Sequence, residues 1–498
     1  MAAPYRNVAT VTVSRKPGPP AMDLPLTACL FAGAVTATLA ALAVAQTSTA
    51  RLALAALLAL PFLALGFLMM IWSPDLIVYA LVAGACLTLF NIKIAIAGAH
   101  VRPNMVFAAL AGAAWIARIA LGIDRPRRVP YLLPLALVDV VYAASTLLHT
   151  PHEWVTRGLM DCFLYALNVL QYAMVVWFLE RDRGLAVRAA KSLLAGTAFY
   201  SGATSLLFLA ARLNLGWADS LTSRIPGSNV TRIDMLWTTQ GSYLAFAVIV
   251  PLCLLVFFPR GMGGVSRRFV LSVLLINLAG LVLTFARGPW LAVLATLPLL
   301  FVFAAVRYPI RRGMRRIALA TVLASMAALL ASILLIAFVP KVSAMVAARG
   351  ENIVNLSGTA MGRIQLWDSM WDGFKKAPVF GRGARTWERY TIIPRQATEN
   401  FAIELLYSSG LAGAGTLLSA VVAISLGALR RIWTWPRASL DPWTFALFWG
   451  FVAMFGASMT NPAAWGGYFW IVMGALVSTA GAGRPPATPC ESESVCRC

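Results

Sequence analysis

Stretches of about 20 mainly apolar residues follow one another along most of this 498-residue chain. A helix of that length spans the hydrocarbon core of a lipid bilayer. Because 60% of the residues are hydrophobic and only 12% are charged, a soluble fold would expose a large apolar surface. The sequence therefore predicts an all-α, polytopic membrane helix bundle of about 12–14 transmembrane helices. The candidate spans are 25–46, 51–72, 76–92, 104–122, 130–146, 155–180, 186–211, 241–259, 268–286, 288–306, 316–339, 402–428, 441–457 and 464–482.

The net charge of +22 is spread over short hydrophilic gaps between the apolar stretches. This placement argues against a nucleic-acid surface, which would gather the basic residues on one domain. If the spans alternate in direction, the basic gaps fall on one side of the membrane, and the positive-inside rule makes that side the cytoplasm. Both termini are then cytoplasmic. The basic gaps are 124–128, 180–188, 259–268, 307–316 and 430–437, together with the N-terminal stretch.

The same pattern predicts five parts of the chain. They are a cytoplasmic N-terminal tail at 1–24, transmembrane helices at 25–339, one long outer loop at 340–400, C-terminal transmembrane helices at 401–482 and a cytoplasmic tail at 483–498. No secretory signal is expected, because the first apolar stretch is long enough to remain in the membrane. The outer loop is thus the main hydrophilic segment on the outer side.

Within the outer loop, residues 360–374 place apolar and charged side chains at three- and four-residue spacing. Such spacing predicts an amphipathic helix, and its two tryptophans favour a position on the membrane surface. Pro378 ends the helix, and the Gly-Arg-Gly sequence at 381–383 makes the following turn. On these residues alone, a simple interfacial anchor and a part of a functional site both remain open.

Three arginines on the outer side are candidates for holding an anion. Arg287 lies in a four-residue turn between two apolar stretches, where a guanidinium is expensive to keep without a partner. The alternative interpretation is that the Arg287 side chain serves no anion and only extends to the polar surface of the membrane. Arg224 and Arg232 lie in another outer loop, and solubility of that loop explains them equally well.

Three short motifs follow one another on the predicted outer side. They are LTFARGPWLAVL at 283–294, GRIQLWDSMWDGFKKAPVFGRG at 362–383 and, at the start of the next span, the set Asn400, Glu404, Leu405, Leu406, Gly410 and Gly413. In order and spacing they resemble the elements of the O-antigen ligase and polysaccharide polymerase superfamily of bacterial membrane glycosyltransferases. The resemblance covers about 220–480 of the chain. Glu399 stands in the place of the superfamily's histidine.

The resemblance implies transfer of a glycan from undecaprenyl pyrophosphate to an acceptor hydroxyl on the periplasmic face of the bacterial inner membrane, with inversion of the anomeric bond. Such a displacement needs cations for the departing pyrophosphate and a base for the incoming hydroxyl. The implied pyrophosphate ligands are Arg287, Arg363, Arg224 and Arg232, whose guanidinium groups match phosphate oxygens. The implied catalytic set is Glu399 as the base, Asn400, and Glu404 as an orienting partner of an arginine.

A glutamate in water is a weaker base than a histidine, although desolvation at a membrane edge raises the pKa of a carboxyl group. The alternative for Glu399 is an acid in the first turn of a helix, stabilised by the helix dipole alone. His100, His149 and His152 remain reserve candidates for the base.

No metal or other cofactor is expected, because the first outer loop (46–50) carries no acid and no Asp-x-Asp pair occurs on the outer side. Within the superfamily, a polymerase would take another glycan repeat unit as acceptor, and a ligase would take the lipid A core; we favour the polymerase. A membrane transporter or lipid-linked glycan flippase is the alternative from another class. It would show internal repeats of spans, which are not evident in this sequence.

Overall fold

A computed structural model describes residues 63–90, 94–96, 99–213, 222–224, 231–233, 238–258, 263–284, 286–307, 359–384, 400–435, 440–459 and 466–481. The chain divides into two compact units, Met1–Gly66 and Phe67–Cys498. Residues 63–66 are the described part of the first unit. The second unit contains the helical bundle.

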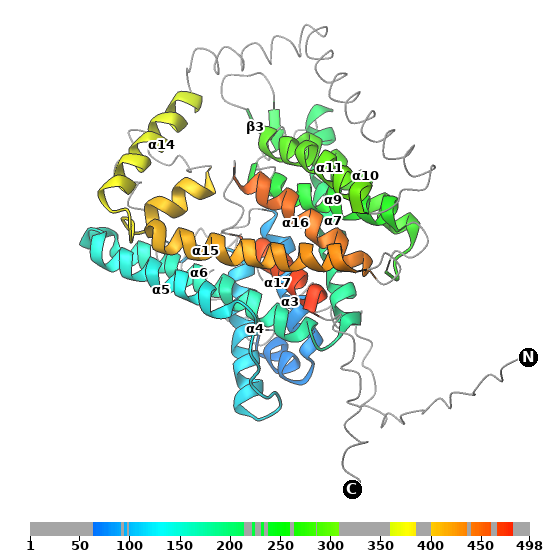
Figure 1. The fold of residues 1–498 in the computed structure, drawn as a ribbon, viewed down its shortest axis with the longest axis horizontal. Coiled ribbons are helices and arrows are strands. Elements are labelled where there is room, and N and C mark those ends of the chain that lie inside the picture. The colour runs from blue at the N-terminus through cyan, green and yellow to red at the C-terminus, as the bar shows by residue number, and fades with distance from the viewer. Residues whose placement is uncertain are drawn as a thin grey trace, which may run out of the picture. The chain divides into compact units, whose positions relative to one another are not determined.

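The described part of the chain is almost entirely helical (Figure 1). Its helices are Leu63–Trp72, α3 (Pro74–Thr88), α4 (Pro103–Ala120), α5 (Leu132–His149), α6 (His152–Leu179), α7 (Arg183–Arg212), α9 (Thr238–Phe257), α10 (Arg267–Leu283), α11 (Arg287–Arg307), α14 (Thr359–Lys376), α15 (Phe401–Thr434), α16 (Pro442–Ser458) and α17 (Gly467–Gly481). Two short antiparallel hairpins lie between helices: β1 (Ile94–Ile96) with β2 (Ala99–Val101), and β3 (Thr222–Arg224) with β4 (Thr231–Ile233). The prediction of an all-α polytopic bundle is confirmed, with the two hairpins as small additions.

Apolar length and local capping determine where these helices lie. Every predicted span within the described residues corresponds to a helix, with shifts of a few residues at the ends. In this part of the chain, seven helices are long and apolar enough to cross a membrane, and four shorter helices are also apolar. Ser266 and Asp441 begin α10 and α16 by accepting backbone N–H bonds. The predicted spans 25–46 and 316–339 lie outside the described residues.

The helices differ in how much of their surface they bury. α9 and α17 are buried on nearly all sides, and the rings of Tyr243 and Tyr468 lie 4.7 Å apart between them. α5 instead exposes apolar side chains along one side, including Leu133, Val140 and Leu148. Exposed apolar side chains of this kind suit contact with lipid chains.

Basic loops meet at one end of the bundle. This basic end comprises residues 121–131, 180–183, 263–267 and 430–435. The buried Asp124 accepts hydrogen bonds from Arg118 at 2.7 Å and from Arg181 at 2.6 Å, which joins the ends of α4 and α6. Arg183 forms an ion pair with Asp441 at 2.9 Å, which joins the starts of α7 and α16. The described parts of the gaps that the sequence assigned to one side of the membrane therefore share one end of the bundle.

Away from the basic end, polar side chains join four helices. The end of the bundle at which α14 packs on the first part of α15 is called the α14 end. Thr88 at the end of α3 donates to the Asn104 side chain at 3.0 Å, and Gln171 of α6 donates to the Asn104 carbonyl at 3.1 Å. Gln240 at the start of α9 donates to the carbonyl of Leu89 at 3.1 Å. These amide and hydroxyl groups are buried, so their hydrogen bonds fix the relative positions of the helices.

Candidate functional site

Helix α15 is interrupted at Gly410. The backbone there has φ 61° and ψ −165°, a conformation that is essentially restricted to glycine. In a continuous helix, the N–H groups of residues 411 and 412 would donate to the carbonyls of residues 407 and 408. The interruption leaves these four backbone groups in need of other partners.

Residues 378–384, which we call the clasp, supply those partners. The four hydrogen bonds, donor first, are Arg382 to Tyr407 at 2.7 Å, Gly383 to Ser408 at 3.0 Å, Leu411 to Pro378 at 2.8 Å and Ala412 to Val379 at 2.9 Å. The clasp therefore satisfies both orphaned N–H groups and both orphaned carbonyls. Each bond contributes about 1 kcal/mol net, and a buried group left without one costs more.

Glycines make this close approach possible. Gly381 and Gly383 have φ values of 74° and 85°, which favour glycine. A Cβ atom on Gly381 would lie 2.5 Å from the nitrogen of Gly410, and one on Gly410 would lie 2.4 Å from the carbonyl oxygen of Val379. The Pro-x-x-Gly-x-Gly motif and Gly410, which the sequence presents as separate motifs, are thus two sides of one contact.

The clasp is also fixed to α5 and α6. The Ser145 hydroxyl donates to the carbonyl of Ser408 at 3.0 Å, and the N–H of Ala384 donates to the Thr146 hydroxyl at 3.1 Å. Gly158 of α6 faces Ala384, whose carbonyl oxygen would lie 3.5 Å from a Cβ at that position. The outer-loop motif is therefore built into the bundle rather than lying free on its surface.

Helix α14 confirms the predicted amphipathic helix and packs on the first part of α15 (Figure 1). Leu366 and Met370 are buried against Tyr407. Gly373 admits the ring of Tyr407, which would lie 2.4 Å from a Cβ atom there. Trp371 remains 45% exposed, so α15 covers only part of the apolar face and leaves the rest available to a membrane surface.

Two of the sequence-predicted catalytic residues lie at the start of α15. Asn400 is the N-cap, and its side-chain oxygen accepts the N–H of Ile403 at 3.1 Å. Glu404 is half-buried in the first turn, and its N–H donates to the Asn400 carbonyl at 3.1 Å. The sequence analysis did not anticipate the capping role of Asn400, although asparagine before a helix is a recognisable signal.

Arg287 begins α11 directly after the short turn that ends α10. Trp290 closes the turn by donating from Nε1 to the carbonyl of Leu281 at 2.8 Å. The turn packs on the start of α9, where a Cβ atom on Gly241 would lie 2.6 Å from Pro289. The turn is therefore as tight as the sequence predicts, and it is fixed against the start of α9.

For the remaining predicted arginines, the backbone shows in which element each residue lies. Arg363 lies near the start of α14, and Arg224 and Arg232 lie on the two strands of the β3–β4 hairpin that precedes α9. Glu399 lies outside the described residues.

The ends of α11 and α15 contact each other. Arg307 at the end of α11 donates to the carbonyls of Trp433 and, at 3.2 Å, Trp435 at the end of α15. The last turns of the two helices are therefore in contact, and Arg287, Asn400 and Glu404 lie at the other ends of the same two helices.

Two of the cavities in the described part of the chain are lined by polar side chains. One, of about 340 Å³, lies at the α14 end and is lined by His149, Lys376 and Arg382, with Val379 and Phe380 beside them. Sequence reasoning kept His149 only as a reserve base and interpreted Arg382 only as part of a turn. In the sequence, His149 and Lys376 lie at the ends of two separate helices, so the sequence could not show that they line one cavity with Arg382.

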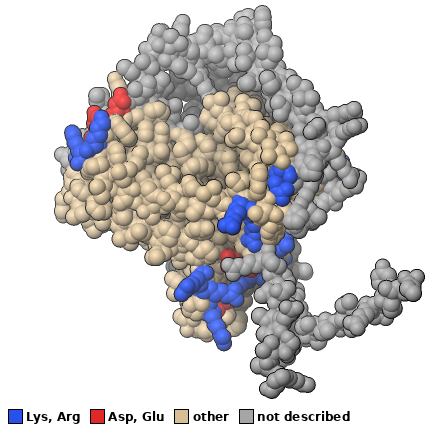
Figure 2. Space-filling view, in the orientation of Figure 1, with Lys and Arg blue, Asp and Glu red and all other residues tan. Residues whose placement is uncertain are grey.

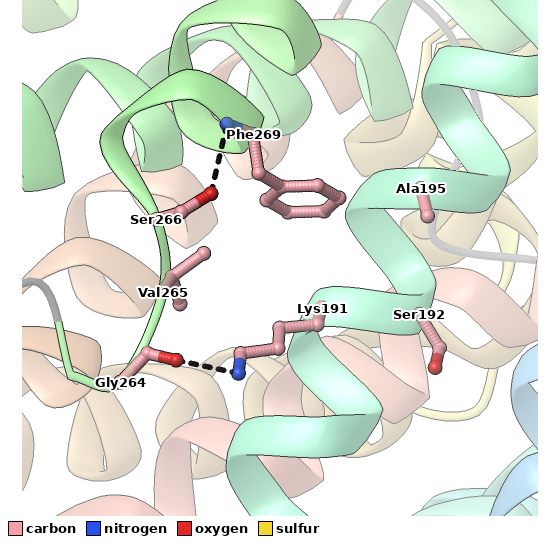
Figure 3. Close-up of a pocket in the computed structure, with 7 residues that line it drawn as sticks. All are labelled: Lys191, Ser192, Ala195, Gly264, Val265, Ser266 and Phe269. Atoms are coloured by element: carbon pink, nitrogen blue, oxygen red, sulfur yellow. Dashed lines mark hydrogen bonds between the residues drawn. The ribbon is translucent and has the colours of Figure 1, made fainter.

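The second cavity, of about 350 Å³, lies at the basic end between α7 and the start of α10 (Figure 3). Lys191 lies along its edge and donates to the carbonyl of Gly264 at 2.7 Å. The Ser266 side chain caps α10 by accepting the N–H of Phe269. Because these polar groups hold the turn at 263–266 in place, this cavity is a structural feature of the loop.

Surface charge follows the same division into two ends. Figure 2 shows Lys and Arg side chains over α14 and, separately, toward the opposite side of the view, with an uncharged surface between them. On α14, Lys375 pairs with Asp372 at 3.1 Å. On this face, an uncharged surface between two charged regions is what a protein that crosses a membrane is expected to show.

The described residues contain no group of three or more His, Cys, Asp or Glu placed to hold a metal ion. The described side chains at the α14 end instead offer hydroxyl, amide and cationic groups. Such groups suit an anionic or hydroxyl-rich ligand.

The apolar helices, the uncharged surface in Figure 2 and the two polar ends define a multi-pass helical membrane protein. The family described as O-Antigen ligase matches residues 271–418, a region that contains α10, α11, α14, the clasp and the break in α15. The match confirms the resemblance to the O-antigen ligase and polymerase superfamily, which is a family of enzymes. No curated protein and no solved structure matches the chain.

Proposed function

We propose that this protein is a membrane glycosyltransferase that polymerises undecaprenyl-pyrophosphate-linked oligosaccharide repeat units on the outer face of the bacterial inner membrane. The observation that carries the proposal is the O-antigen ligase match over residues 271–418. That region includes Arg287, the clasp and the start of α15. In this proposal the α14 end faces the periplasm, residues 340–400 form the outer loop, and both termini are cytoplasmic.

The proposed reaction is a direct displacement. The acceptor's hydroxyl oxygen attacks the anomeric carbon of the donor, and the bond from that carbon to the pyrophosphate oxygen breaks. The electron pair leaves with undecaprenyl pyrophosphate, and attack from the opposite side inverts the anomeric centre. Arg287 and Arg363, with Arg224 or Arg232, stabilise the leaving charge, and no metal is needed for this step.

Residues at the start of α15 handle the acceptor in this proposal. Glu399 takes the proton of the incoming hydroxyl. The Asn400 side chain accepts the N–H of Ile403 at 3.1 Å and so fixes the residue at which α15 begins. Asn400 thereby positions Glu399, which directly precedes it. Glu404, one turn later, pairs with an arginine and orients it.

A ligase that transfers glycan to the lipid A core is the alternative, and the description of the matching family as O-antigen ligase favours it. Both enzymes use the same donor chemistry and differ in the acceptor. The proposed site therefore serves either function, and the choice depends on which acceptor the purified protein uses.

Substitution of Arg287 tests the pyrophosphate site. Arg287→Lys keeps the charge but loses the planar pair of donors, so polymer formation should fall at least about tenfold, which corresponds to about 1.4 kcal/mol. Polymer is measured on gels from cells whose own copy is deleted, with the membrane level of the protein as the control. Full polymer yield from Arg287→Ala at normal expression would remove this residue from the mechanism.

Substitution of Glu399 tests the base. Glu399→Gln keeps the size of the side chain but does not accept a proton, so polymer formation should be lost while the protein level is unchanged. Glu399→His restores the superfamily's residue and should retain part of the activity. Wild-type polymer from Glu399→Gln would show that the base is elsewhere.

A further inference from the structure

The cavity at the α14 end is lined by three basic side chains from three different segments. His149 ends α5, Lys376 ends α14 and Arg382 lies in the clasp. None of the described lining residues is acidic. At about 340 Å³, the cavity lies within the size range of small-molecule sites. Its chemistry therefore favours an anionic group.

Two of these basic residues lie at the ends of helices, and the third lies in the clasp. His149 and Lys376 lie in the last turns of helices, where the helix dipole favours positive charge. Arg382 lies outside any helix, and its backbone N–H is fixed to the Tyr407 carbonyl at 2.7 Å. The guanidinium is thus carried on a segment that the break in α15 holds rigidly.

Helix α14 contacts both Tyr407 and the Arg382 side chain at Gly373. A Cβ atom at Gly373 would lie 3.4 Å from Cδ of Arg382 and 2.4 Å from the Tyr407 ring. A glycine inside a helix costs about 0.5–1 kcal/mol relative to alanine. The helix accepts this cost because the Tyr407 ring packs against Gly373, and the Arg382 side chain lies in van der Waals contact with the same position.

The mouth of the cavity is apolar. Val379 and Phe380 line it and are 54% and 49% exposed. Leu147 and Leu148, directly before His149, are also exposed. Basic groups beside exposed apolar side chains fit a phosphate group that carries a long hydrocarbon chain better than they fit a free sugar or a soluble anion.

We propose that this cavity docks the pyrophosphate headgroup of the lipid-linked donor as it arrives from the membrane. Lys376 and Arg382 hold the phosphate oxygens, with His149 beside them, and the polyprenyl chain lies along Val379 and Phe380. The proposal rests on the proposed function and adds a docking site to it. Arg382 is bonded to Tyr407, about 4.5 Å along the helix axis from Glu404, so a docked headgroup is close to the start of α15.

Equilibrium binding of undecaprenyl pyrophosphate without sugar tests this site. The full-length protein in nanodiscs of phosphatidylcholine is compared with Lys376→Gln/Arg382→Gln. The clasp bonds are made by the backbone and persist in this variant, so it should fold normally and show a Kd raised at least about tenfold. Lys191→Gln is the matched control, because it changes a lysine at a cavity of similar size at the basic end. It should bind like the wild type.

Three outcomes would overturn the docking site. The first is a Kd of the double variant within twofold of the wild type, and the second is a loss of affinity in Lys191→Gln equal to that in the double variant. The third is displacement of undecaprenyl pyrophosphate by an equimolar amount of phosphatidylglycerol, which would make the cavity a phospholipid site. Arg382→Lys/Lys376→Arg, which keeps both charges, should restore part of the binding and so exclude a folding defect. Because the probe carries no sugar, this result is independent of whether the protein transfers glycan.

Discussion

Asp124 is a buried carboxylate between two arginines, and its surroundings define its role. Burial alone raises the pKa of this carboxyl group, but the hydrogen bonds and charges of Arg118 and Arg181 outweigh burial and hold the pKa below its ordinary value of 3.8. The folded state therefore binds its proton less tightly than the unfolded state does. Asp124 contributes its full stabilisation of the folded state when the pH is above the ordinary pKa of 3.8. This contribution is lost as the pH falls through the lower pKa that the carboxyl group has in the folded state.

Asp124→Asn should therefore destabilise the protein strongly at neutral pH. It leaves Arg118, which is 6% exposed, without its carboxylate, and removal of one partner of a buried pair costs about 3–5 kcal/mol. The apparent melting temperature in detergent should fall, and the gap from the wild type should narrow only below about pH 4. Asp372→Asn, which breaks an exposed pair with Lys375, should cost less than about 1 kcal/mol. Equal effects of the two substitutions would contradict this account.

Single residues were only partly predictable from the sequence. The motif placed Asn400 and Glu404 at a helix start, and the structure agrees. The buried cluster at Asp124 was not predicted, because its ion pair with Arg181 joins residues that are 57 positions apart in the sequence. Arg382 was treated as part of a turn, because its contacts with Gly373 and Tyr407 depend on how α14 packs on α15.

At the scale of elements, the break in α15 is the feature that organises the α14 end. Gly410→Ala should prevent the clasp from docking, because the alanine Cβ would meet Val379 and the backbone conformation excludes it. The cost should be at least about 3 kcal/mol. The melting temperature in detergent measures it. Gly415→Ala, in the same helix with nothing within 4 Å of its Cβ position, should be neutral or stabilise by up to about 1 kcal/mol. A Gly410→Ala protein as stable as Gly415→Ala would show that the clasp is dispensable.

The elements themselves were largely predictable, and their irregularities were not. Apolar runs predicted α4, α9 and α16 closely, because helix length in a membrane follows from the thickness of the bilayer. The same runs pass through Gly410 without interruption, so hydropathy predicts one continuous span. The break exists because a distant segment supplies backbone hydrogen bonds, and no local pattern contains that information.

At the scale of the whole molecule, the two ends of the bundle carry the predicted topology. Ser369 on α14 and Arg128 in the loop before α5 are both exposed, and they lie at opposite ends. In a chain without native cysteines, Ser369→Cys should react with a membrane-impermeant thiol reagent added to intact spheroplasts. Arg128→Cys should react only after the membrane is opened. The reverse pattern would place the clasp and the start of α15 in the cytoplasm, where the proposed donor is not used.

The central claim is that this protein transfers lipid-linked glycan without a metal. The most direct measurement is the conversion of undecaprenyl-pyrophosphate-linked repeat units by the purified protein, with a chelator present and with or without lipid A core. The account predicts longer lipid-linked glycan from repeat units alone, at the same rate with and without the chelator. Product formed only when lipid A core is supplied would identify the ligase instead. Absence of any product, or product that requires a divalent cation, would contradict the account.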